Sequence, residues 1–289
     1  MAYRVRFWGT RGSIPTPGPS TIRYGGNTPC VSLHSEDGDG VLAILDAGTG
    51  IRALGQELVA RNRDEGTLDL LVSHTHWDHI QGLPFFAPIL PGGTKVRIWG
   101  AKQAGVAVDK ILRDQMSPVV FPVPLDDIAA EVEVRNVEPG TFTTNHFTVR
   151  AMMVRHPGTT MGYVLQPTSG GATLGYVTDN ELSGGNYDVG PGWKREFVEF
   201  VRGVNVLVHD AMYTTGELQQ HIGWGHSSNI EATQLAVEAQ VDQLVLFHHR
   251  PEHDDGTIDA MVEEARGTAR RLGSKVEIIA AQEGMDLHM

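Results

Sequence analysis

Short apolar runs alternate with amphipathic segments along the whole chain of 289 residues. Runs of about four to eight aliphatic and β-branched residues, bounded by turn residues, are typical of strands. They predict strands over residues 3–7, 31–34, 41–45, 68–72, 96–99, 132–136, 147–154, 162–166, 173–177, 204–208, 243–247 and 276–280. Apolar residues spaced three and four apart predict helices over 51–62, 103–114, 229–239 and 258–272. The glycine-bearing segments 36–40 and 169–171 predict hairpin turns.

This alternation predicts an α/β fold and leaves two architectures open. One has two sheets with helices packed outside them, and the other is a doubly wound parallel sheet. No linker rich in proline, glycine or serine is long enough to separate two domains, and the sequence has no internal repeat. We therefore expect residues 1–289 to form a single domain. The proline-rich apolar loop Pro118–Pro124 is either a flap over the substrate or a packing or dimer element.

Composition narrows the class of protein. A hydrophobic fraction of 40% with 20% charged residues is typical of a soluble globular chain. A net charge of −12 argues against a broad basic surface for nucleic acid. The single cysteine, Cys30, excludes an intrachain disulfide and a four-thiolate metal site, and we expect it to be a small buried residue. The sequence shows no membrane-length apolar run and no signal pattern, so we expect a cytoplasmic protein without membrane contact.

Four potential metal ligands follow the predicted strand 68–72 within six residues, in the segment Ser73-His74-Thr75-His76-Trp77-Asp78-His79. Side chains at alternate positions 74, 76 and 78 are expected to project from one side of an extended segment, with His79 turning into the next helix. Imidazoles and a carboxylate without thiolates suit zinc, manganese or iron rather than a closed structural zinc site. The ligands are too many for one ion with an open position, so we expect two ions.

This segment resembles the His-x-His-x-Asp-His signature of the metallo-β-lactamase superfamily. Further landmarks appear in the family's order up to about residue 253, namely Asp46, His156, Asp179 and His248. The resemblance implies a four-layer αββα sandwich that binds two divalent metal ions, with Zn²⁺ favoured over Mn²⁺ or Fe²⁺. One ion would bind His74, His76 and His156, and the other would bind Asp78, His79 and His248. Asp179 would bridge them, and Asp46 would support the site.

Within the superfamily the chain is most similar to the branch with ribonuclease Z and the cyclic-phosphate phosphodiesterases. Val208-His209-Asp210-Ala211 resembles the branch's His-Glu-Ala-Thr segment with an aspartate in place of glutamate, and Gly225-His226-Ser227-Ser228 resembles its Gly-His-Ser-Thr loop. The resemblance implies that His226 protonates the leaving oxygen or holds a phosphate oxygen, with Asp210 orienting it. The catalytic residues would then be His226, Asp210 and Asp78.

One choice between neighbouring residues is open at the sequence level. His248 and His249 compete for the last ligand position, and alignment to the strand-end histidine of the family favours His248. The pattern Ser228-Asn229-Ile230-Glu231 is a capping box, so a helix is expected to begin just after His226. Its free N–H groups would lie near an anionic substrate.

The leading functional prediction is a phosphodiesterase that uses metal-bound hydroxide on a nucleotide, a cyclic nucleotide or another small phosphodiester. Alternatives are a lactone, β-lactam or thioester hydrolase, an endoribonuclease that processes transfer-RNA 3′ ends, and a non-catalytic metal-binding sensor. Ribonuclease Z carries an inserted basic, glycine-rich arm for its substrate, and nothing between Phe142 and Gly203 in this sequence resembles such an arm. The resemblance therefore disfavours a long nucleic acid as substrate. A small anionic substrate is expected. The resemblance also suggests a homodimer, because this branch often dimerises.

Overall fold

The computed structural model describes residues 1–36, 40–61, 66–90, 94–128 and 130–289. Two seven-stranded sheets form its centre. The first has the order β14-β1-β2-β3-β4-β5-β6 and comprises β1 (Tyr3–Gly9), β2 (Cys30–Ser35), β3 (Val41–Leu45), β4 (Thr67–Leu71), β5 (Lys95–Gly100), β6 (Glu131–Asn136) and β14 (Asp286–His288). The second has the order β13-β12-β11-β10-β9-β8-β7 and comprises β7 (Gly140–Thr143), β8 (Phe147–Met153), β9 (Met161–Pro167), β10 (Leu174–Val177), β11 (Val206–Asp210), β12 (Gln243–Phe247) and β13 (Glu277–Ala280).

Both sheets are mixed. Strands β3 to β6 run parallel, as do β10 to β13, while the remaining neighbours pair antiparallel. Parallel strands need crossover segments, and the helices supply them. The helical elements are α1 (Ile51–Arg61), α2 (Trp77–Ile80), η1 (Leu83–Phe85), η2 (Ala87–Ile89), α3 (Val108–Gln115), η3 (Leu125–Asp127), α4 (Trp193–Val201), α5 (Thr215–Leu218), α6 (Asn229–Glu238) and α7 (Asp255–Arg271).

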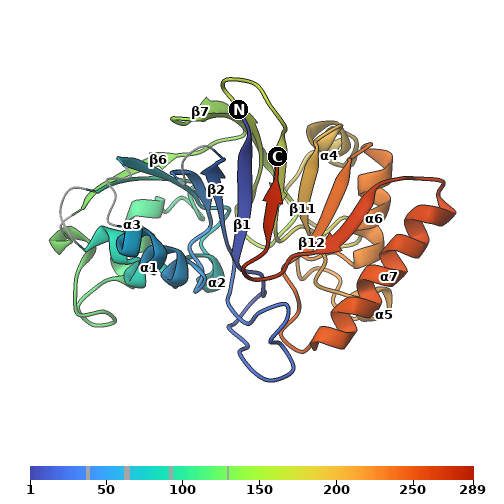
Figure 1. Cartoon of the computed structure of the whole chain (residues 1–289), viewed down its shortest axis with the longest axis horizontal. Coiled ribbons are helices and arrows are strands. Elements are labelled where there is room, and N and C mark those ends of the chain that lie inside the picture. The colour runs from blue at the N-terminus through green and yellow to red at the C-terminus, as the bar shows by residue number, and fades with distance from the viewer. Residues whose placement is uncertain (37–39, 62–65, 91–93, 129) are drawn as a thin grey trace.

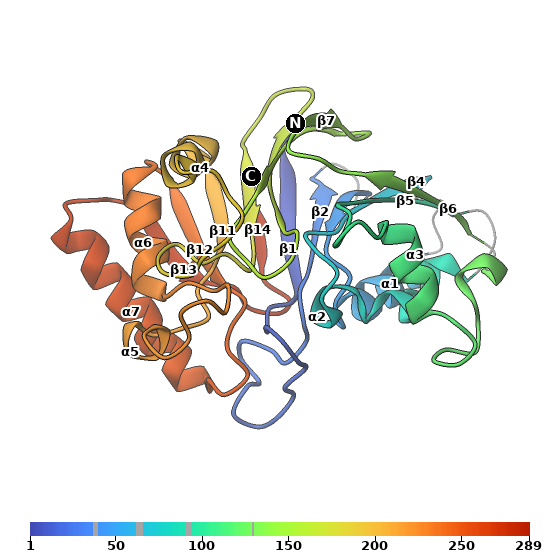
Figure 2. The ribbon, with the colours of Figure 1, turned by 180° about the vertical axis from the view of Figure 1, so that it is seen from behind.

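Helices cover the outer face of each sheet (Figures 1 and 2). Helices α1 and α3 lie against the first sheet, and α4, α6 and α7 lie against the second. The predicted four-layer αββα sandwich is confirmed, and the doubly wound single sheet is excluded. Among the described residues, no helix is long and apolar enough to cross a membrane.

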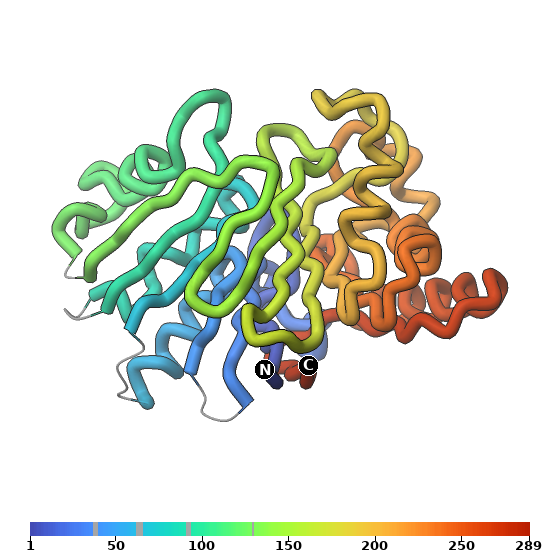
Figure 3. The backbone as a smooth tube through the Cα atoms, turned by 90° about the horizontal axis from the view of Figure 1, so that it is seen from above, coloured from blue at the N-terminus to red at the C-terminus, as the bar shows by residue number. Residues whose placement is uncertain are grey.

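Alternation along the strands builds three layers of core. In β12, Leu244 and Leu246 pack toward α6 and α7, while Val245 and Phe247 pack between the sheets. The tube trace of Figure 3 shows the two sheets facing each other along this middle layer. Each central strand is therefore apolar on both faces, which explains why the sequence shows continuous apolar runs rather than strict alternation. Cys30 is buried and unpaired, as predicted.

The predicted elements were found with shifted ends. The helix expected over 103–114 begins at Val108, and the strand expected over 204–208 extends from Val206 to Asp210. The turn at 169–171 joins the antiparallel pair β9 and β10. The turn at 36–40 joins β2 and β3, although residues 37–39 lie outside the described part of the chain, as does residue 62 of the first predicted helix. The helix expected from His79 is α2, which begins two residues earlier at Trp77, and the sequence did not predict β7, β14, α4, α5 or the short 3₁₀ turns.

Candidate metal centre

Strand ends carry the polar residues of the centre, and several adopt a left-handed backbone. Asp46 follows β3 with φ 59°, Asp179 follows β10 with φ 49°, and His248 follows β12 with φ 61°. Non-glycine residues rarely take this conformation, although Asp and His tolerate it better than most. The chain thus turns sharply as each strand ends, which brings these three side chains to one place between the two sheets.

Three histidines form the first group of donors. The Nδ1 atom of His76 lies 2.9 Å from Nε2 of His74 and 3.0 Å from Nε2 of His156. The Nδ1–H of His156 donates to the carbonyl of Gly225 at 3.0 Å, so its Nε2 keeps a lone pair. Burial lowers the pKa of His74 well below its usual value and that of His156 to about 4, which keeps both rings neutral. One proton on His76 cannot satisfy both neighbours, whereas a metal ion can accept all three nitrogens.

Two carboxylates and two histidines form the second group. Nε2 of His79 lies 3.2 Å from Oδ2 of Asp78 and 3.2 Å from Oδ1 of Asp179. Its Nδ1–H donates to Asp46 at 2.8 Å, so Nε2 is the ring atom that faces the two carboxylates, and it is buried without a hydrogen-bond partner. Burial opposes a charge on His79, but the surrounding carboxylates raise its pKa well above the usual value. Positive charge is therefore favoured at this point, and a divalent metal ion would neutralise more of the buried negative charge than a proton.

Asp179 stands between the two groups with one oxygen toward each. Its Oδ1 lies 3.2 Å from Nε2 of both His79 and His248, and its Oδ2 lies 3.7 Å from Nε2 of both His74 and His156. Burial favours the neutral acid, but the neighbouring histidines hold the pKa of Asp179 well below its usual range. A charged carboxylate with this orientation can bridge two ions.

His226 and Asp210 lie beside the second group as a hydrogen-bonded pair. The Nδ1–H of His226 donates to Oδ2 of Asp210 at 2.6 Å, and Oδ1 of Asp210 accepts from the amides of Met212 and Ser227 at 3.0 and 3.1 Å. Burial lowers the pKa of His226, but the charge and hydrogen bond of Asp210 outweigh it and raise the value to about 9. His226 is therefore a cation at neutral pH, with its other ring nitrogen free to donate.

The family match agrees with this geometry. The Beta-lactamase superfamily domain matches residues 43–249. The chain belongs to this superfamily. The family match confirms the prediction of a metal-dependent hydrolase of the metallo-β-lactamase superfamily that is similar to ribonuclease Z. The fold together with the His/Asp cluster implies divalent metal ions.

Known proteins similar to this chain cover nearly all of it. A ribonuclease Z from Bacillus cereus (strain B4264) is 23% identical over 300 aligned residues, which cover 90% of this chain and 92% of that protein. The metallo-β-lactamase fold protein YhfI from Bacillus subtilis has a TM-score of 0.70 at 20% identity, with 100% of both chains covered. A diphosphatase from the PhnP family has a TM-score of 0.64 at 15% identity and covers 100% of this chain and 98% of that one. These structural likenesses show the shared fold.

Every residue expected to bind metal lies in one of the two groups of donors, and two details differ from the prediction. Asp78 does not continue the extended segment of His74 and His76, because that segment ends at His76 and Asp78 lies in the first turn of α2. His248 lies in the second group, whereas Nε2 of His249 contacts the carbonyl of Ala281 at 2.9 Å. The side chain of His249 therefore points away from the centre.

The helix that follows His226 begins as predicted, but its amides are not free. Ser228 caps α6 in a capping box with Glu231. The amides of Ser227, Ser228 and Asn229 donate to Asp210, Glu231 and the carbonyl of Tyr213, respectively. The expectation that free N–H groups of this first turn face the substrate is wrong for these positions, because protein acceptors already occupy them.

Two contributors were missed from the sequence. The amide of Ser13 donates to Oδ2 of Asp78 at 2.8 Å, so the loop after β1 holds a metal-facing carboxylate. Buried Glu181 accepts from the amides of Gly223 and Gly225 at 2.9 and 3.0 Å and thereby fixes the loop that carries His226. The turn 9–13 carries a weak sequence signal for the first contact, but nothing in the sequence connects residue 181 with residues 223–225.

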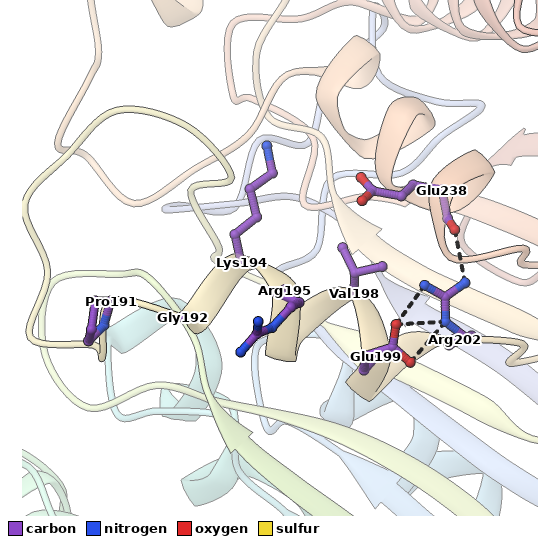
Figure 4. A pocket seen from close by; sticks show the side chains of 8 residues that line it. All are labelled: Pro191, Gly192, Lys194, Arg195, Val198, Glu199, Arg202 and Glu238. Atoms are coloured by element: carbon purple, nitrogen blue, oxygen red, sulfur yellow. Dashed lines mark hydrogen bonds and ion pairs between the residues drawn. The ribbon is translucent and has the colours of Figure 1, made fainter.

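A surface hollow beside α4 does not belong to this centre. Figure 4 shows it lined by Pro191, Gly192, Lys194, Arg195, Val198, Glu199, Arg202 and Glu238. Arg202 is engaged with the carboxylate of Glu199 at 2.7–3.0 Å and with the carbonyl of Glu238 at 3.2 Å. None of the lining residues takes part in either group of metal donors, so the metal centre is the candidate active site.

Proposed function

We propose that this protein is a phosphodiesterase with two divalent metal ions that acts on a small anionic phosphodiester such as a nucleotide or cyclic nucleotide. One ion would be held by His74, His76 and His156, the other by Asp78, His79 and His248, with Asp179 shared. Bound there, the ions would generate a nucleophile from water near neutral pH and stabilise negative charge on the substrate oxygens. The nitrogen and oxygen donors suit Zn²⁺ best, followed by Mn²⁺ or Fe²⁺.

The Asp210–His226 pair is the observation that favours a phosphodiester over the other substrate classes. Cleavage of a phosphodiester expels an alkoxide, which leaves more readily when it is protonated. His226 is protonated at neutral pH, because its pKa is about 9. Asp210 holds Nδ1 of the ring, which lies beside the rings of His156 and His248, and this leaves the proton on Nε2 for the substrate. One donor atom each from Asp179, Asp210, His226 and His248 lie within 4.8 Å of one another. His226 can therefore deliver its proton to a leaving oxygen beside the metal-facing carboxylate.

The remaining expectations belong to the same proposal. Residues 1–289 form one domain, since the donors come from both sheets. The cytoplasmic location and the homodimer remain predictions from the sequence.

The test is a hydrolysis screen with protein that is first stripped by a chelator and then reloaded with Zn²⁺, Mn²⁺ or Fe²⁺. The panel contains bis(p-nitrophenyl) phosphate, 2′,3′- and 3′,5′-cyclic nucleotides, a lactone and a β-lactam. We expect phosphodiester turnover that is lost on chelation and restored by metal, and that is lost in Asp179→Asn but kept in His288→Ala, a control at an exposed histidine. Faster turnover of the lactone or β-lactam, or none of any phosphodiester, would overturn the proposal.

A second candidate is 3′ processing of transfer RNA, favoured by the curated relatives named ribonuclease Z. The net charge of −12 disfavours a long nucleic acid across the surface. Specific 3′ cleavage of a precursor transfer RNA by the metal-loaded protein would favour this candidate, and the absence of cleavage would leave the small phosphodiester.

A further inference from the structure

Exposure separates the five tryptophans of the chain into two kinds. Trp8 and Trp193 are buried, and half-buried Trp99 stacks on Phe142 with ring centroids 4.7 Å apart. Trp77 and Trp224 are 79% and 61% exposed. Both exposed tryptophans are neighbours in the sequence of residues of the metal centre, while the other three pack in the fold. Large exposed apolar side chains beside a polar site are typical of ligand contacts.

Both indoles belong to segments that touch the first group of donors. Trp77 stands between His76 and Asp78 in the sequence, and Trp224 directly precedes Gly225, whose carbonyl accepts from Nδ1 of His156 at 3.0 Å. The facing nitrogens of His76 and His156 are 3.0 Å apart. His76 is also the exposed member of its group, so the centre opens to solvent beside these two segments.

Hydrogen bonds and ring contacts hold the loop that carries Trp224 in place. Buried Glu181 accepts from the amides on either side of Trp224, those of Gly223 and Gly225, and the amide of Trp224 donates to the carbonyl of His221 at 3.1 Å. The indole meets the edge of His221 at 5.0 Å, and His221 stacks on Tyr213 at 4.6 Å. An aromatic surface fixed in this way loses little conformational entropy when a ligand stacks on it.

We propose that Trp77 and Trp224 form an aromatic subsite that stacks the planar base of a nucleoside phosphodiester whose phosphate lies at the metal centre. The proposal rests on the phosphodiesterase function proposed above and narrows its substrate to one that carries a base. Every base offers a π-face to an indole, so the subsite accepts different bases. An alkyl diester has no ring to stack and therefore binds less tightly.

The first test compares two diesters with the same leaving group, thymidine 5′-(p-nitrophenyl phosphate) and methyl p-nitrophenyl phosphate. We expect the wild-type protein to prefer the nucleoside diester, and the ratio of the two kcat/KM values to fall about 5- to 100-fold in Trp224→Ala and in Trp77→Ala. Trp224→Phe keeps most of the ratio because it keeps a ring. Leu272→Ala, which removes an exposed side chain at the end of α7, leaves both kcat/KM values unchanged. An unchanged ratio in both tryptophan variants overturns the subsite.

Binding to the Zn²⁺-loaded protein tests the subsite independently of hydrolysis. Calorimetric titration with AMP and with ribose 5-phosphate, which share the phosphate and the sugar, isolates the contribution of the base. We expect AMP to bind about 5- to 100-fold more tightly, with the advantage lost in both alanine variants. Equal affinities, or no AMP binding, overturn the subsite even if diesters are hydrolysed. An AMP advantage without diester hydrolysis upholds the subsite and overturns the proposed function.

The exposed indoles could instead contact a second copy of this chain, and the molar mass of the variants tests this alternative. If the indoles contact a ligand and not a second subunit, Trp77→Ala and Trp224→Ala keep the wild-type mass in light scattering. A shift from dimer to monomer in either variant would assign the indoles to a subunit interface and overturn the subsite.

Discussion

At the residue scale, the histidines of the centre are held in defined tautomers by their second nitrogen. His156 donates from Nδ1 to the carbonyl of Gly225, His79 donates from Nδ1 to Asp46, and His226 donates from Nδ1 to Asp210. The remaining nitrogen of each ring therefore faces the centre. Burial lowers the pKa of His156 and keeps that ring neutral, whereas the charge and hydrogen bond of Asp210 outweigh burial, raise the pKa of His226 and keep that ring charged. In the proposed function, one residue type would thus supply both a metal ligand and an acid.

Removal of this acid is expected to depend on the leaving group. His226→Ala lowers kcat about 100- to 1,000-fold for a cyclic nucleotide, whose alkoxide needs a proton, and far less for bis(p-nitrophenyl) phosphate, whose phenolate does not. Steady-state kinetics on the two substrates, with metal content measured alongside, checks this. Equal losses on both substrates, or loss of bound metal in the variant, would contradict the role of an acid.

The same residue predicts an alkaline limit to activity. The acid is present below its pKa of about 9 and is lost as the pH rises through that value, so kcat for the cyclic nucleotide falls on the alkaline side. Asp210→Asn removes the charge that raises the pKa, and the fall is expected to move to lower pH. A pH–rate profile of both proteins measures the shift, and an identical alkaline limb in the two would exclude His226 as its origin.

At the element scale, the loop between α5 and α6 is part of the metal centre through its backbone. Gly225 has φ +87°, and a Cβ atom there would lie 2.1 Å from Nδ1 of His156. Gly223, two residues earlier, has φ +89° and open space around its Cα. The two glycines have nearly the same positive φ, but only Gly225 lies against a residue of the metal centre.

This contrast gives a matched pair of substitutions. Gly225→Ala and Gly223→Ala each cost about 1–2 kcal/mol of stability for a left-handed alanine. Only Gly225→Ala displaces His156, so we expect it alone to lose one metal ion per chain and at least ten-fold in kcat. Metal analysis and thermal unfolding of both variants separate the two effects. The same metal content in both would show that the close approach of Gly225 is not needed for binding.

Elements of the fold were predictable where periodicity is strong and less so where tertiary contacts decide. The twelve predicted strands follow from apolar runs, and the donors from the spacing of His74, His76 and His79 together with the family resemblance. Strands β7 and β14 were missed because they are short and lie at the edges of the sheets. The contact of Glu181 with Gly223 and Gly225 joins residues about forty positions apart and depends on a turn that local sequence does not encode.

At the scale of the whole molecule, the metal centre joins the two sheets. His74, His76, Asp78 and His79 follow β4 of the first sheet, whereas His156, Asp179 and His248 come from loops of the second. Asp46 links both halves, since it accepts from Ser73 of the first sheet and from the hydroxyl of Tyr176 of the second at 2.8 Å. The buried carboxylates of Asp78 and Asp179 meet at this junction, so cations bound there offset repulsion where the sheets come together.

Chelation is therefore expected to destabilise the whole fold rather than one loop. A ligand that binds only the folded state at about 100 times its Kd adds about 2.7 kcal/mol per site, and a chain of this size changes its Tm by about 2 °C per kcal/mol. Removal of two ions should then lower Tm by about 11 °C in a single cooperative transition, which calorimetry measures. His288→Ala keeps the full shift, and Asp179→Asn keeps only a small part of it because a carboxylate shared by both groups is gone. A Tm that does not respond to chelator, with metal loss verified by elemental analysis, would show that the ions do not stabilise the junction between the sheets.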